Sequence, residues 1–197
     1  MAFAIFLIGC SRSPGTPSMT VRTLHGEVFD SIGDMLVDSR LPLSPDLSYA
    51  TVDVANGEMT IVVGFAPGTF DRESMAADVF LDTDENPSTG AYASEGIVAG
   101  ADFRVSLDVR ASAGAAGQIS RYSPFHCGPF LLRCFESLSR LNVTATESTL
   151  QTVVPLSMFG EIDGHVTFQV RAVAVTPVTT FDTDLMPNLN LPPGRVQ

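Results

Sequence analysis

Lysine is missing from this 197-residue chain, and so is tryptophan. All eleven basic residues are therefore arginine, and 22 acidic residues outnumber them, which gives a net charge of −11 at pH 7. Because a nucleic-acid partner requires a basic surface to neutralise its phosphates, this charge argues against nucleic-acid binding. An acidic surface fits a solvated extracellular protein and one that holds a divalent cation, although solubility alone explains it as well.

Catalytic signatures are missing too. The chain contains no Gly-x-Ser-x-Gly, no His-Glu-x-x-His and no phosphate-binding loop. A glycosidase needs two carboxylates placed by the fold, and 22 acidic residues always allow such a pair, so this pattern carries almost no signal. The three histidines are scattered and offer no ligand set for haem. The sequence therefore predicts a protein that is not an enzyme.

The residues that are abundant indicate β-structure. Thirteen phenylalanines and many valines and threonines favour strands over helices. Two alternating runs, 48–55 and 59–65, flank Asn56-Gly57, which is the strongest hairpin signal in the chain. The run 102–110 also alternates, with inward positions at Phe103, Val105, Leu107 and Val109. Other strands are predicted at 21–29, 77–81, 118–122, 140–146, 149–154 and 165–176.

About nine or ten short strands with almost no helix predict an all-β fold. The expected architecture is a two-sheet antiparallel β-sandwich of the jelly-roll kind, and a closed barrel is the alternative. This domain is expected over residues 19–190, followed by a loose tail over 191–197 that is rich in proline.

One stretch concentrates hard oxygen donors at the end of a predicted strand. Asp82, Asp84 and Asn86 are two residues apart, so an extended strand end would point all three to one side. Pro87 then turns the chain, and Asp102 follows the intervening loop and offers a fourth side-chain oxygen. Such a set suits Ca²⁺, which neutralises carboxylates that otherwise repel each other.

This candidate site is not an EF-hand, because Pro87 holds the position of the invariant glycine and Ala93 that of the bidentate glutamate. The alternative is that these side chains only cap the strand end through Asx-turns. Two weaker acidic pairs, Asp30 with Asp34 and Asp182 with Asp184, are expected to be turn residues.

The N-terminus looks like a targeting segment over 1–18. An apolar run, Ala2–Ile8, leads into Leu-Ile-Gly-Cys10, which resembles the lipobox of bacterial lipoproteins, whose cysteine is lipidated. The segment 11–18 is rich in Ser, Pro and Gly, as a flexible tether is. No basic residue precedes the apolar run, unlike in most signal peptides, and a misplaced start codon would explain this. The alternative is an apolar N-terminus with an incidental cysteine.

The two remaining cysteines, Cys127 and Cys134, are separated by six residues in a segment rich in Pro and Gly. In an exported protein, an even pair at this spacing predicts a local disulfide. Free thiols remain an alternative, and so does a metal site that includes His126, although two cysteines and one histidine are an incomplete zinc set.

The order of the motifs carries a family resemblance. Asp-x-x-Gly-Asp at 30–34 and Asp46-Leu47 precede the Asn-Gly hairpin. Leu-Asp-Thr-Asp-x-Asn-Pro-x-Thr-Gly at 81–90, Gly-Ala-Asp-Phe at 100–103 and Val-Pro-Leu-Ser at 154–157 follow it. This order resembles bacterial extracellular β-sandwich modules related to the DOMON and family 9 carbohydrate-binding superfamily.

The resemblance implies a jelly-roll-like sandwich that often binds calcium, a sugar or haem. Without tryptophan, stacking on a sugar ring would fall to the exposed phenylalanines and to Tyr49, Tyr92 and Tyr122. We therefore expect a calcium-stabilised binding module of the bacterial cell envelope, lipid-anchored or secreted, that meets the membrane only through its anchor. Its expected ligand is a glycan or another envelope component. The alternatives are a structural protein that contacts an envelope protein and an enzyme that uses the carboxylates.

Overall fold

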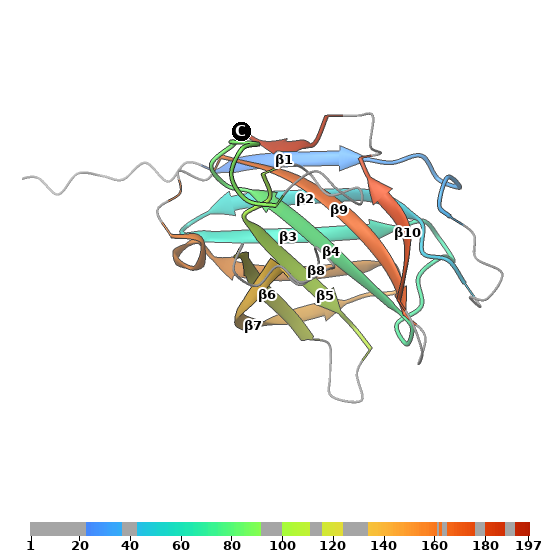
Figure 1. The fold of residues 1–197 in the computed structure, drawn as a ribbon. Coiled ribbons are helices and arrows are strands. Elements are labelled where there is room, and N and C mark those ends of the chain that lie inside the picture. Colours follow the sequence, from blue (N-terminus) through green and yellow to red (C-terminus); the bar gives the residue numbers. More distant parts are fainter. Residues whose placement is uncertain are drawn as a thin grey trace, which may run out of the picture.

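The computed structural model describes residues 23–36, 43–91, 100–110, 116–123, 134–160, 162, 165–175, 180–187 and 192–197. Within these residues the fold is all-β and antiparallel, as predicted, and the short 3₁₀ turn η3, Leu156–Phe159, is the one helical element that they describe in full (Figure 1). The strands are β1 Leu24–Phe29, β2 Leu47–Ala55, β3 Glu58–Phe65, β4 Met75–Asp82, β5 Phe103–Asp108, β6 Ala116–Tyr122, β7 Phe135–Ala145, β8 Thr149–Pro155, β9 Val166–Val175, β10 Thr180–Met186 and β11 Gly194–Val196.

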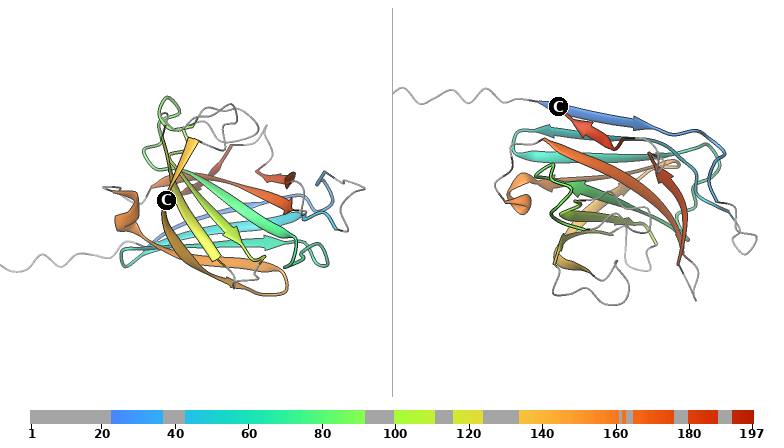
Figure 2. Two further views of the ribbon diagram at one scale, coloured as in Figure 1. Left: turned by 60° about the horizontal axis from the view of Figure 1, so that its bottom comes forward. Right: turned by 45° about the horizontal axis from the view of Figure 1, so that its top comes forward.

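The strands form one continuous sheet that curls until it is nearly closed (Figure 2). Neighbours follow the order β1-β2-β3-β8-β7-β6-β5-β4-β9-β10, and β11 also pairs with β9. The backbone of His25 exchanges two hydrogen bonds with Gln197, which brings β1 beside β11 and so towards β9. The two ends of the sheet therefore approach each other.

The division into two separate sheets is not confirmed, and the reason lies in β7. Its first part pairs with β6, and its last three residues, 143–145, pair with β8. A register shift leaves Leu138 of β7 as an extra residue opposite Ile119 and Ser120, within the part of β7 that pairs with β6. One long strand thus belongs to both halves of the curled sheet.

The hairpin between β2 and β3 is confirmed. Asn56 and Gly57 have φ angles of 54° and 81°, the left-handed pair that a type I′ turn requires. On β5, the alternation predicted from the sequence also holds, since Phe103, Val105 and Leu107 are buried in the core inside the curled sheet.

The C-terminal segment differs from the prediction. Residues 194–196, expected in a loose tail, form β11 on β9, and Val196 is fully buried. Three residues are too few to show an alternating pattern that the sequence alone would reveal. The segment 180–186, expected to hold a turn, is instead strand β10.

Several predictions fall outside the described residues. These are the targeting segment 1–18 with Cys10, and Cys127 of the predicted disulfide. Its proposed partner Cys134 is described and buried just before β7. In the part of the chain that the structure describes, no helix has both the length and the apolar character to span a bilayer.

Candidate metal centre

The acidic cluster lies where β4 ends and β5 begins. These strands are antiparallel and place Leu81 opposite Phe103, so Asp82 and Asp102 extend from neighbouring strand ends. Asp84 follows in the turn after β4. Each of these three carboxylates offers an oxygen within 4.8 Å of the others. The structure thus brings together three of the four residues predicted from the sequence.

The fourth predicted residue, Asn86, lies in the same turn and bonds to this cluster through its backbone. Its amide N–H donates to Asp84 Oδ1 at 2.9 Å and, at 3.3 Å, to Asp82 Oδ1. Its side-chain Oδ1 accepts a hydrogen bond from the Ser88 amide at 3.1 Å. Thr89 completes the turn, because its hydroxyl donates to Asp84 at 2.9 Å. The Asx-turn caps expected in the alternative reading are therefore present beside the cluster.

Gly100 packs closely against these groups. Its φ of +91° favours glycine, and a Cβ there would lie 2.8 Å from Asp82 Oδ2 and 2.8 Å from the Asn86 carbonyl oxygen. A carboxylate oxygen and a backbone carbonyl oxygen thus border the same point. These are the two kinds of oxygen that Ca²⁺ collects from a protein, so the residues fit this ion.

The electrostatics of the cluster also favour a cation. Asp82 is only 4% exposed. Burial, followed by a hydrogen bond with Asp84 and the charge of Asp102, raises the pKa of Asp82 to about 6. Two carboxylates share a hydrogen bond only when a proton lies between them, and a bound cation removes the need for that proton. The cluster can therefore bind either a proton or a metal ion, depending on pH.

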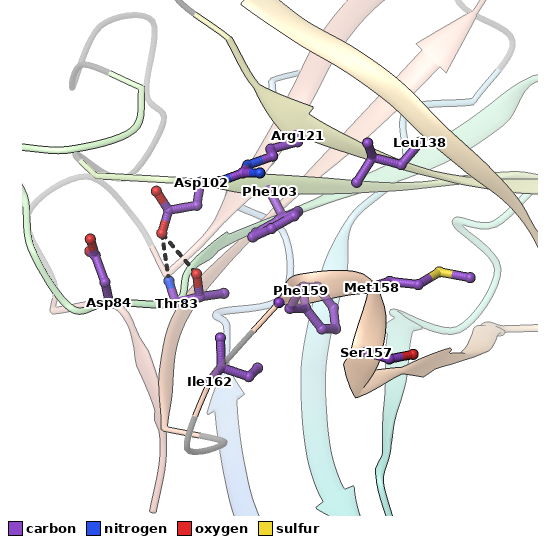
Figure 3. Close-up of a pocket in the computed structure, with 11 residues that line it drawn as sticks. Thr83, Asp84, Asp102, Phe103, Arg121, Leu138, Ser157, Met158, Phe159 and Ile162 are labelled. Carbon is purple, nitrogen blue, oxygen red and sulfur yellow. Dashed lines mark hydrogen bonds between the residues drawn. The ribbon is translucent and has the colours of Figure 1, made fainter.

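A pocket of about 520 Å³ adjoins the cluster and shares Asp84 and Asp102 with it (Figure 3). Phe103 and Phe159 meet edge to face in its wall, with ring centroids 5.1 Å apart. The guanidinium of Arg121 lies 5.9 Å from the centroid of the Phe103 ring. The remaining lining residues are Thr83, Leu138, Ser157, Met158, Gly160 and Ile162.

Sequence reasoning missed this pocket. The pattern predicted Phe103 only as a core residue. Nothing in it placed Arg121 of β6 near the acidic loop, the segment 82–90 that carries Asp82, Asp84 and Asn86. The turn η3 is local in sequence, but its position over the end of the curled sheet depends on the fold. The pocket arises because η3 and the ends of β4, β5 and β6 meet there.

An ion pair holds the acidic loop to the C-terminal strand. Nε and one terminal nitrogen of the Arg195 guanidinium each donate to one carboxylate oxygen of Glu85 at 2.8 Å. The two residues are 110 positions apart in the sequence. Glu85 adopts a φ of 51°, which is uncommon for a residue other than glycine. Strand β11, which sequence reasoning missed, therefore anchors the turn that carries the cluster.

Comparisons with known proteins add no assignment to this geometry. No known protein family matches the chain by its sequence profile, and no curated protein matches it significantly in sequence.

Proposed function

We propose that the chain is an exported, lipid-anchored binding module whose fold is stabilised by calcium and whose ligand is a glycan or another component of the cell envelope. It acts by binding and not by catalysis. The proposal includes the relationship to the DOMON and family 9 carbohydrate-binding superfamily, the lipidation of Cys10 and the disulfide between Cys127 and Cys134. Each of these rests on the sequence motifs described above.

The observation that carries the proposal is that the pocket and the acidic cluster share Asp84 and Asp102. Ordering of the acidic loop by a cation would fix one wall of the pocket. Binding of a ligand there would then depend on calcium even if the ion never touched the ligand.

The lining of the pocket suits a polyol. Carboxylates accept hydrogen bonds from sugar hydroxyls, and the guanidinium of Arg121 donates them. Phe103 and Phe159 supply apolar faces for the C–H side of a sugar ring, although both are largely buried, at 4% and 6% exposed. The mixture of a few charged groups with apolar surface is typical of small-ligand sites.

The test is glycan-array binding of the 197-residue chain in calcium and in EDTA, followed by titration of any glycan that binds. We expect binding that requires calcium and weakens about tenfold or more in Arg121→Ala, since a hydrogen bond from a charged group is lost. Arg140→Ala is the matched control, because Arg140 is exposed on β7 and is not among the residues that line the pocket. Equal binding by both variants, or no glycan bound at all, would contradict the ligand assignment.

A second candidate function is contact with a protein of the envelope, without a small ligand. It is favoured by three large apolar side chains near the end of β1, Phe29, Ile32 and Leu36, which are 68%, 67% and 71% exposed. Co-purification of a protein partner that is lost in Phe29→Ser, with no glycan bound on the array, would support this function instead. Turnover of a glycoside that is lost on changing Asp84 or Asp102 would establish an enzyme.

A further inference from the structure

We propose that the chain has a second calcium site, formed by Asp30, Asp34, Asp46 and Asp184 at the seam between β1, β2 and β10. The acidic loop lies at the other end of the curled sheet (Figure 1). The sequence predicted Asp30, Asp34 and Asp184 as turn residues only, and it did not group them with Asp46.

Three of the four carboxylates converge from distant parts of the chain. Asp30 follows β1, Asp34 lies in the next turn, and Asp184 belongs to β10. Each offers an oxygen within 4.8 Å of the other two. The fold therefore gathers three carboxyl groups at one point.

The buried carboxylate of Asp46 is the feature that indicates a ligand. It is only 1% exposed, and its Oδ1 is buried without a hydrogen-bond partner. Its other oxygen, Oδ2, accepts a hydrogen bond from the Gly33 amide at 2.8 Å, in the turn between Asp30 and Asp34. A buried carboxylate oxygen without a donor is unfavourable, and a cation bound beside it would remove that cost.

The neighbouring contacts place Asp46 beside the cluster. The amide of Leu47, the next residue, donates to Asp184 Oδ2 at 2.6 Å. Asp46 is thus held between the turn that carries Asp34 and the strand that carries Asp184. Burial is the main cause that raises the pKa of both Asp46 and Asp30. The negative charge of Asp34 raises both further, and that of Asp46 adds to the rise at Asp30, which agrees with this closeness.

The donor set selects the class of ion. All four donors are carboxylates, which suit hard cations, and they come from three separate segments. Ca²⁺ accepts six to eight oxygens in irregular geometry, whereas Mg²⁺ demands a near-ideal octahedron. Since β1 and β10 are the two ends of the strand order, a calcium ion here would join the margins of the curled sheet.

The test is calorimetric titration of the metal-stripped 197-residue chain with Ca²⁺. We expect two ions bound per chain, one in Asp34→Asn, one in Asp84→Asn and none in the double variant. Asp34 is exposed, so its substitution leaves no buried hole. Asp46→Asn is the second variant, and it too should bind one ion.

The stoichiometries separate this inference from the proposed site in the acidic loop. Two ions retained in both Asp34→Asn and Asp46→Asn would overturn the second site, as would a single ion that only Asp84→Asn removes. A single ion that Asp34→Asn removes and Asp84→Asn does not would support the second site and contradict the first. If Asp46→Asn fails to fold, Asp34→Asn decides alone.

Discussion

Asp102 accepts two hydrogen bonds from Thr83 through a single oxygen, Oδ2, at 3.0 Å from the amide nitrogen and 2.9 Å from the hydroxyl. These bonds join the residue after β4 to the residue before β5 and orient the carboxylate at the boundary of the acidic cluster and the pocket (Figure 3). Groups that orient a metal ligand in this way contribute to affinity without touching the ion.

Replacing the Thr83 hydroxyl tests this relationship. Thr83→Val keeps the volume and the backbone amide but removes one donor to Asp102. We expect calcium affinity at the acidic loop to fall about tenfold to a hundredfold, the range for groups that orient metal ligands. Titration calorimetry measures this affinity in a chain that also carries Asp34→Asn, which removes the second proposed site. Thr144→Val, on the exposed face of β7, is the control. An affinity equal to that of the control would show that Asp102 needs no such support.

Glycine at position 100 should be required by both the turn and the cluster. In Gly100→Ala the new Cβ would lie against Asp82 Oδ2 and the Asn86 carbonyl at a φ of +91°. We expect a loss of at least about 1 kcal/mol in the free energy of unfolding, together with weaker calcium binding. Gly57→Ala is a matched control, because its φ of +81° is equally strained but nothing lies within 4 Å of its Cβ. Gly57→Ala should lose stability but keep its calcium affinity. An equal loss of calcium affinity in both variants would contradict a direct effect of Gly100 on the acidic cluster.

The metal-stripped protein should lose stability as pH rises from about 4 to 6. The pKa of Asp82 is raised from 3.8 to about 6, so the folded state holds this proton more tightly than the unfolded state does. The favourable contribution is complete below the unfolded pKa and is lost through the folded one, with an upper bound of about 3 kcal/mol. Urea unfolding of the wild type and of Asp82→Asn isolates the effect, since other carboxylates titrate in both proteins. Without metal, the difference in unfolding free energy between the two proteins should vary with pH, and a difference that is independent of pH would contradict this expectation.

The C-terminal strand should contribute to stability. Val196 is fully buried on β11, so Val196→Ala should cost about 2 kcal/mol in the free energy of unfolding, for two methyl groups removed from the core. Arg195→Ala, one residue away, removes only a partly exposed ion pair with Glu85 and should cost less stability than Val196→Ala does. Denaturant unfolding measures both, and equal effects near zero would restore the expectation of a loose tail.

The features that sequence reasoning found are the ones with a local signal. Asn56-Gly57 requires φ angles that few residue pairs adopt, and the alternation on β5 reports one buried face. Asp82, Asp84 and Asp102 were found because acidic residues at two strand ends interrupt apolar patterns.

The missed features depend on how distant segments pair. Arg121 reaches the pocket only because β6 lies beside β5, and Asp184 meets Asp30 only because the sheet curls until β10 nears β1. Neither pairing has a signature in the local sequence. The sequence predicted two sheets and not a single curled sheet for a similar reason. The single sheet depends on β7 pairing with both β6 and β8.

The most direct test of the central claim is a thermal melt of the chain carrying Asp34→Asn, with and without excess Ca²⁺, compared with the same chain carrying Asp84→Ala as well. The Asp34→Asn background removes the second proposed site, so any calcium effect reports the acidic loop. A ligand bound only by the folded state adds about 2.7 kcal/mol at a hundredfold excess over its dissociation constant. We predict a clear rise in melting temperature that Asp84→Ala abolishes. An unchanged melt, or a rise that survives Asp84→Ala, would contradict a calcium site in the acidic loop and leave its aspartates as turn caps.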